Sequence, residues 1–288
     1  MKTLTILQKN ACAACLVLAF IGYSWGLAHG SPGIQKSGRR SEAKNSAGQP
    51  KAKPEQAMPF HVGEKLNYRV AWATFSDAAD VQLTVPEKRD LFGWKTWHFL
   101  AAVHTVKPVR SLFTIDDQFD SYTDAVSLES RDYEDYLNEL GKSQTDVLHL
   151  IPKGEQPRAP GSAVVVLPGT RDPLGMLYTM RAANWQQTPE MRAPVYDGRN
   201  LYEMHANIES AADPIQVDAG AYKAFRIAIR LFQNDKEDPL IHFTLWLAND
   251  PERTPVRIAA QLPFGTLRVD LTTTNQERAD NRRDNFRR

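Results

Sequence analysis

Apolar and polar side chains alternate along most of the chain between residues 65 and 274. Neighbouring side chains of an extended strand point to opposite faces, so a period of two is typical of a strand with one buried face. The apolar positions are clearest at Leu66, Tyr68, Val70 and Trp72; at Val81, Leu83 and Val85; at Trp97, Phe99, Ala101 and Val103; and at Ile241, Phe243, Leu245 and Leu247. The pattern predicts a mainly β protein.

Turn-forming residues separate these alternating segments. The dipeptide Asp197-Gly198 lies between "APVY" and "NLYEMHANI", and it favours the positive φ angles of a tight hairpin turn. The stretches "NDKEDP" (234–239) and "PFG" (263–265) separate later segments in the same way. Successive hairpins produce an antiparallel meander, and curling such a sheet removes its exposed edges. We therefore expect a meander curled into a half-barrel, a spiral or a barrel.

One segment, "RDPLGMLYTMRAANW" (171–185), departs from the period of two. Asp172 can cap a helix whose first residue is Pro173, because proline is tolerated at the first helical position. Leu174, Leu177, Tyr178 and Arg181 then follow at helical spacing. The segment predicts one short helix packed against the sheet, with a charged side chain on its apolar stripe.

The stretch "ANDPERTP" (248–255) concentrates charge between two apolar runs, so it could be a site or a turn. Asn249, Asp250 and Pro251 are ordinary turn formers, and Arg257 begins the outward-facing set of the next strand. We interpret the charged residues of this stretch, which include Glu252 and Arg253, as part of a hairpin connection.

The N-terminus has the layout of an export signal. Lys2 and Lys9 precede an uncharged apolar segment at 11–28, and small residues follow it. We expect a signal peptide at residues 1–30 and a periplasmic or otherwise exported protein. The alternative is an uncleaved inner-membrane anchor, since 18 residues are near the lower limit for spanning a bilayer. Cys12 and Cys15 both lie in this segment, so the mature chain would have no disulfide or thiol nucleophile.

Charge is unevenly distributed along the chain. The formal total of +1 includes +2 in residues 1–30, +4 in 31–57 and +2 in 275–288, which leaves −7 for the body at 58–274. An acidic body is unsuited to binding nucleic acid, because that affinity comes mostly from neutralising phosphates. Residues 31–57 and 275–288 contain few large apolar side chains, which predicts a disordered basic tether and tail around a single β-rich domain at 58–274. Membrane contact is expected only through the N-terminal segment or the tether.

Several motifs occur in an order that resembles an exported bacterial family known as domain-of-unknown-function family 3108. They are "MPFHVGEKLNYRVAW", "DPLGMLYTMR", "DGRNLYEM", "DAGAYKAFRI", "LWLANDPERTPVRI" and "FGTLRVDL", and together they cover about residues 59–273. The resemblance implies a β-rich, barrel-like or spiral domain in the cell envelope. It transfers no reaction and no active-site residue.

The mature chain has no G-x-S-x-G, H-E-x-x-H or Walker motif, and we single out no catalytic residue, metal ligand or cofactor. The histidines, including His98 and His104, are expected to be ordinary strand residues. In "RDYEDYLNE" the alternation of carboxylates and tyrosines could suit a sugar-binding surface, but a solvated edge or loop is favoured.

Arg181 is the leading candidate for a binding residue, because an unpaired guanidinium on an apolar stripe is costly. It could pair with an internal carboxylate, extend its charged group to water, or anchor an anionic ligand. Trp72, Trp185 and Trp246 could line the same cavity, and we single out Trp72, Trp246 and Tyr178 as further ligand-binding candidates beside Arg181. The resulting hypothesis is a non-catalytic envelope domain that binds or scaffolds a lipid-like or cell-wall ligand, or an envelope protein partner. The alternative is a cell-wall hydrolase that uses carboxylates.

Overall fold

The computed structural model describes residues 57–158, 163–262 and 265–275. The predicted signal peptide, nearly all of the tether and all but the first residue of the tail lie outside these ranges. The elements are β1 (Lys65–Trp72), β2 (Phe75–Leu91), β3 (Trp94–Thr105), the short 3₁₀ helix η3 (Val109–Ser111), β4 (Asp116–Asp124), β5 (Ser130–Glu139), β6 (Lys142–Pro152), β7 (Ala163–Val166), α2 (Pro173–Ala182), β8 (Glu190–Tyr196), β9 (Leu201–Val217), β10 (Gly220–Gln233), β11 (Lys236–Ala248), β12 (Pro255–Leu262) and β13 (Gly265–Thr274).

All the strands belong to one 13-stranded sheet in the order β7-β6-β5-β4-β3-β2-β1-β13-β12-β11-β10-β9-β8. The chain runs outward from β1 to β7, crosses through α2 to β8, and returns strand by strand to β13, which pairs with β1. Every pairing is antiparallel except β6 with β7. The predicted mainly β, antiparallel fold is therefore confirmed, and the parallel pair marks the point where the chain leaves the first half of the sheet.

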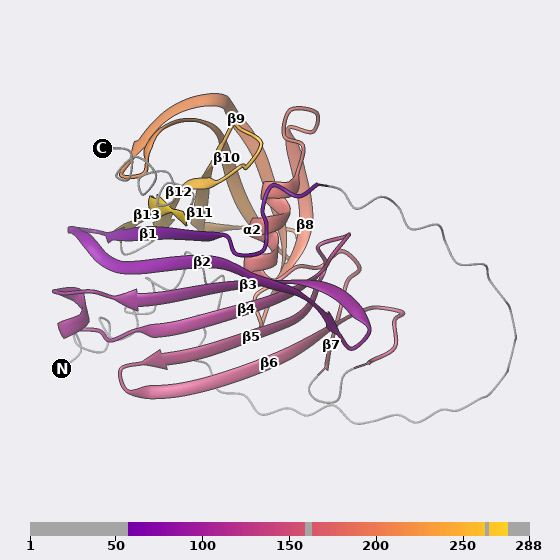
Figure 1. The fold of residues 1–288 in the computed structure, drawn as a ribbon. Helices are drawn as coiled ribbons and strands as arrows, with labels where there is room; N and C mark the ends of the chain where they lie inside the picture. Colours follow the sequence, from indigo (N-terminus) through magenta and orange to yellow (C-terminus); the bar gives the residue numbers. More distant parts are fainter. Residues whose placement is uncertain (1–56, 159–162, 263–264, 276–288) are drawn as a thin grey trace, which may run out of the picture.

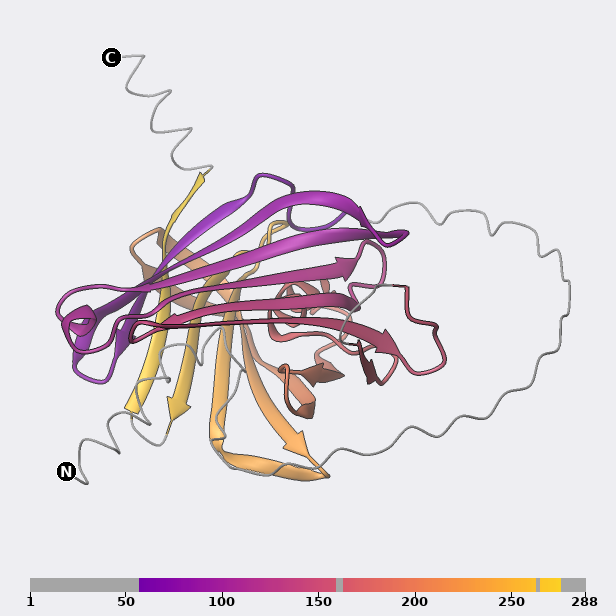
Figure 2. The same cartoon turned by 90° about the horizontal axis from the view of Figure 1, so that it is seen from below.

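The sheet curls so strongly that its two halves face each other. In Figure 2 the strands β1–β6 cross over the strands β9–β13, and the same two layers enclose α2 in Figure 1. A short extended segment at 170–172 nearly closes the ring between β5 and β8. Ser130 N–H donates to the Thr170 carbonyl at 3.1 Å, while Arg171 N–H donates to the Pro194 carbonyl at 3.1 Å and its carbonyl accepts from Tyr196 N–H at 2.9 Å.

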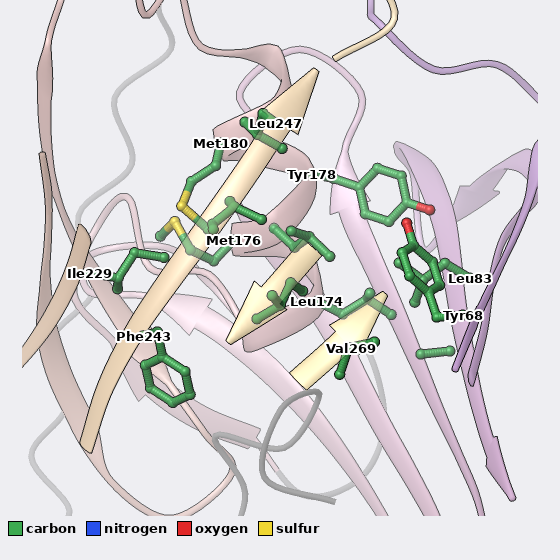
Figure 3. Packing of buried hydrophobic residues seen from close by; sticks show 14 of the residues in the cluster. Tyr68, Leu83, Leu174, Met176, Tyr178, Met180, Ile229, Phe243, Leu247 and Val269 are labelled. Carbon is green, nitrogen blue, oxygen red and sulfur yellow. The ribbon is translucent and has the colours of Figure 1, made fainter. Parts of the chain in front are cut away.

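Helix α2 lies inside this curl and is buried on nearly every side. Asp172 caps it as predicted, because its Oδ1 accepts from Gly175 N–H at 2.8 Å. The sequence indicated a one-sided apolar stripe, but Met176 and Met180 are buried as well, toward β10 and β11, while Tyr178 points toward β1 and β2 (Figure 3). A helix that is apolar all round belongs in an interior. The helix therefore fills the curl instead of covering one face of it.

The close fit of the helix depends on Gly175. A Cβ atom there would lie 2.9 Å from Ser130 Oγ and 2.9 Å from Thr123 Cγ2, so a larger residue would push the helix away from β4 and β5.

The predicted Asp197-Gly198 turn is also present, as a four-residue connection with Gly198 at φ +94°. No helix in the described ranges is both long enough and apolar enough to span a membrane.

Candidate functional site

The side chain of Arg181, in the last turn of α2, forms a buried ion pair with Glu64. Nη1 donates to Oε1 at 2.6 Å and Nη2 to Oε2 at 2.9 Å, which is the bidentate geometry that stabilises such a pair most. Arg181 is 0% exposed and Glu64 6%. The guanidinium also donates to the backbone carbonyls of Pro59 (3.1 Å), Glu252 (3.2 Å) and Arg253 (3.2 Å). Of the alternatives left open for Arg181, the structure adopts internal pairing with a carboxylate.

The loop between β11 and β12 contributes two of these carbonyls. Asp250 Oδ1 accepts from Glu252 N–H at 3.0 Å and Arg253 N–H at 2.9 Å, so the charged stretch is a turn, as predicted. Arg253 in turn donates to the Ala183 carbonyl at the end of α2. The turn thus holds the C-terminal end of the helix through two arginines, Arg181 and Arg253.

A cavity of about 240 Å³ lies beside the ion pair. Its wall combines carboxylate, hydroxyl and amide groups with apolar side chains, and it is formed by Met58, Pro59, Phe60, His61, Glu64, Leu66, Pro251, Glu252, Thr254, Thr274 and Asn275. Residues from both ends of the described chain, Met58 and Asn275, therefore line this cavity. A mixed lining of this kind can orient a polar group while it covers an apolar one.

Tyr178 lies deeper in the interior and belongs to an aromatic cluster. Its ring stacks on Phe99 with 3.7 Å between centroids and meets the edge of Phe60 at 5.1 Å. The guanidinium carbon of Arg181 lies 5.1 Å from the Tyr178 ring centre. Burial raises the pKa of the Tyr178 hydroxyl far above its ordinary value, so it stays neutral at physiological pH.

The two candidate tryptophans lie elsewhere. Trp246 is on the outer face of β11, where its indole N–H donates to Asp213 Oδ2 at 2.8 Å. Trp72 ends β1 and stacks on Phe75 at 6.3 Å between ring centres. The structure therefore brings Arg181 and Tyr178 together, but neither tryptophan is among the residues that line the 240 Å³ cavity. A ligand-binding role for these four residues stays a prediction.

Two histidine–carboxylate pairs occupy the outer face of β3–β6. His98 Nε2 lies 2.5 Å from Asp120 Oδ1, and His149 Nδ1 lies 2.8 Å from Asp132 Oδ1. Tyr122 lies between the two pairs in the cross-strand register. Within the described ranges, no three His, Cys, Asp or Glu side chains come together in a way that could hold a metal ion.

The prediction that "RDYEDYLNE" forms a solvated edge or loop is wrong. The segment forms β5, which pairs with β4 on one side and β6 on the other, and Asp132 and Asp135 are buried. Their burial raises the pKa of both carboxyls, to about 6 for Asp135, where the nearby Asp146 adds to the effect. Local charge density suggested exposure, whereas the position of the strand in the sheet decided burial.

Glu64 is the important residue that sequence reasoning missed. It lies 117 residues before Arg181, directly before the first alternating segment, where a charged residue looks like ordinary solvent-exposed sequence. The cost of an unpaired Arg181 indicated that a carboxylate partner was needed. Nothing in the sequence indicated which of the many carboxylates would provide it.

Comparisons with solved structures found proteins of low sequence identity. A β-barrel-like protein of domain of unknown function DUF1849 from Brucella abortus is 10% identical with a TM-score of 0.47, and the match covers 74% of this chain and 97% of that one. A candidate lipoprotein from Parabacteroides distasonis is 11% identical with a TM-score of 0.34, over 75% and 97% of the two chains. A candidate exported protein with a YmcC-like fold from Bacteroides fragilis is 9% identical with a TM-score of 0.31, also over 75% and 97%.

Among curated proteins, none matches this chain. A family described as a protein of unknown function, DUF3108, matches residues 67–272. That range begins within β1 and ends within β13, so it contains α2 and all the strands between them. The chain belongs to the DUF3108 family of proteins of unknown function.

Proposed function

We propose that this protein is an exported cell-envelope protein whose domain is a non-catalytic binding domain. The cavity beside Glu64 and Arg181 takes the small polar part of a lipid-like or cell-wall ligand. The observation that carries the proposal is this 240 Å³ cavity, which lies where β1 begins and β13 ends. Helix α2 occupies the interior of the sheet next to it.

The chemistry of the lining supports binding more than catalysis. The Glu64 carboxylate is held by two hydrogen bonds from Arg181, so its charge is compensated and its position is set before a ligand arrives. Glu252 and Thr254 come from a turn that is itself fixed by Asp250 and Arg181. Such preorganisation favours affinity, because little side-chain freedom is lost when the ligand binds.

The position of the cavity supports a membrane-proximal role. Met58 and Asn275, at the two ends of the described chain, both line it. An N-terminal segment that remained in the inner membrane would, through the tether at 31–57, keep the cavity within reach of the lipid surface. This proximity would suit a ligand that is itself a membrane lipid or is attached to one.

Native mass spectrometry of protein purified gently from its own cell envelope tests the proposal. The wild-type chain should show an additional mass that is lost on denaturation. Thr274→Trp should abolish it, because an indole at this position would fill the cavity. Thr266→Trp is the matched control, since Thr266 lies at the exposed other end of the same strand.

An empty wild-type protein, or a Thr274→Trp variant that retains as much ligand as the control, would contradict binding at this cavity. Turnover of labelled cell-wall fragments that Asp132→Asn abolishes would instead establish the hydrolase hypothesis.

A further inference from the structure

A second cavity lies at the β2–β3 turn, among residues other than those that line the Glu64 cavity. It measures about 30 Å³, and its wall includes Phe92, Trp94, Arg131, His149, Glu155 and Arg158. A space of this size admits one water molecule or one hydroxyl group. The inference drawn from it does not rest on the function proposed for the Glu64 cavity.

Arg131 is a buried, charged member of this wall. Arg131 is only 8% exposed, and its Nη1 and Nη2 lie 3.2 Å from Glu155 Oε2 and 3.5 Å from Glu129 Oε2. Two carboxylates therefore hold the Arg131 guanidinium in place beside the cavity before any ligand arrives.

Two aromatic side chains form the apolar part of the same site. The guanidinium groups of Arg131 and Arg158 both pack against the Trp94 ring, with their Cζ atoms 3.8 Å and 4.0 Å from its centre. Phe92 is 44% exposed, and its ring meets His149 edge-on at 5.8 Å. Its backbone has φ +51° in the turn before Gly93, a position where Asn, Asp or Gly is usual. A bulky aromatic residue presented there provides an exposed apolar surface beside polar groups.

The charges in the wall balance. Arg131 and Arg158 are matched by Glu155 and by Asp132, which also contacts His149 at 2.8 Å. A balanced set of donors and acceptors does not select a charged ligand. It suits a neutral molecule that has both hydroxyl groups and an apolar face, which is the chemistry of a saccharide.

We propose that this site binds a neutral saccharide. The apolar face of a sugar ring packs on Phe92, and one hydroxyl enters the cavity among the polar groups of Arg131 and Asp132. Glu155 and Arg158 bind neighbouring hydroxyls. Phe92 lies in the β2–β3 turn, Arg131 lies on β5, and Glu155 and Arg158 lie in the chain that follows β6, so a bound ligand would connect three separate parts of the fold.

The test is an NMR titration of the isotope-labelled protein with chitotriose, cellotriose and maltotriose, followed through the indole N–H of Trp94. At least one neutral trisaccharide should shift this resonance in a saturable manner. Phe92→Ala should weaken that binding about tenfold or more, and Arg131→Lys should weaken it while the positive charge is kept.

Leu140→Ala is the matched control for Phe92→Ala. Leu140 also has φ +51°, is followed by a glycine, and is 47% exposed, but its turn joins β5 to β6 at the opposite end of the sheet, where its N–H donates to the Thr114 carbonyl. The control should bind as wild type does, and thermal unfolding of each variant checks that it is folded. The proposal is overturned by no response to any of the three saccharides, by a response to inorganic phosphate alone, or by equal losses in Phe92→Ala and Leu140→Ala.

Discussion

The inner faces of the two halves of the sheet bury different chemistry. In β8–β13 the buried positions that face α2 are almost all apolar, as at Ile227, Leu245 and Val269. In β4 and β5 the corresponding positions include Asp117, Ser121 and Asp135. Apolar burial is insensitive to protonation, whereas buried carboxyls depend on hydrogen bonds and on their charge state. The comparison indicates that, among the inner faces of the sheet, pH acts on stability mainly through β4 and β5.

Arg181 connects these two halves, so its loss should have the largest effect. Arg181→Met leaves Glu64 as an unpaired buried carboxylate, and breaking a buried pair in this way costs about 3–5 kcal/mol. Urea unfolding should show this loss as a lower midpoint. The double variant Arg181→Met with Glu64→Leu should recover a large part of it, because replacing both charges by apolar groups is often close to neutral. A single variant as stable as wild type would mean that the halves do not depend on this connection.

Asp135 tests the polar half. Its folded pKa of about 6 lies above the ordinary value of 3.8, so the folded state binds the proton more tightly. The wild-type free energy of unfolding should therefore fall as the pH rises from about 4 to about 6, by roughly 1–3 kcal/mol. Asp135→Asn should remove the part of this slope that Asp135 contributes, and it should be more stable than wild type at pH 7.

A second substitution serves as a graded control for Asp135. Asp146 lies opposite Asp135 on β6 and contributes to raising its pKa, so Asp146→Asn should reduce the pH slope without abolishing it. Identical slopes in wild type and Asp135→Asn, measured by urea unfolding at several pH values, would show that Asp135 does not titrate in this way.

Ile227→Val tests the apolar half and should have the smallest effect. Ile227 is fully buried on β10, and removal of one methylene group typically costs about 0.5–1.5 kcal/mol. The same loss is expected at pH 4 and pH 7, because no titrating group contributes to it. A loss that changed strongly with pH would contradict the difference between the two inner faces.

The regular parts of the fold could be predicted because their causes are local. The period of two at Leu66, Tyr68 and Val70 reports which face of β1 is buried, and the Asp172–Pro173 pair marks the start of α2. The turn at Asp250 was also predictable, since its side chain bonds to its own backbone neighbours.

The remaining features depend on contacts between distant residues. The partner of Arg181 lies 117 residues away, and the burial of β5 follows from its neighbours in the sheet and not from its own charged sequence. The segment at 170–172 joins β5 to β8 through backbone hydrogen bonds, which do not depend on side-chain type. The sequence therefore contains no pattern that could have predicted this contact. Trp72 and Trp246 were both candidates for lining the cavity, yet one ends a strand and the other faces outward. The residues of the candidate site thus come together through contacts between distant parts of the chain. The positions of the strands, by contrast, follow from the local alternation of apolar and polar residues.

A crystal structure of the protein purified from its own envelope would test the central claim most directly. We predict electron density for a bound group in the cavity between Phe60 and Thr274, with its polar atoms toward Glu64 or Glu252, and with α2 still inside the curled sheet. A cavity that held only water, or a ligand that had displaced α2 from the interior, would contradict the account.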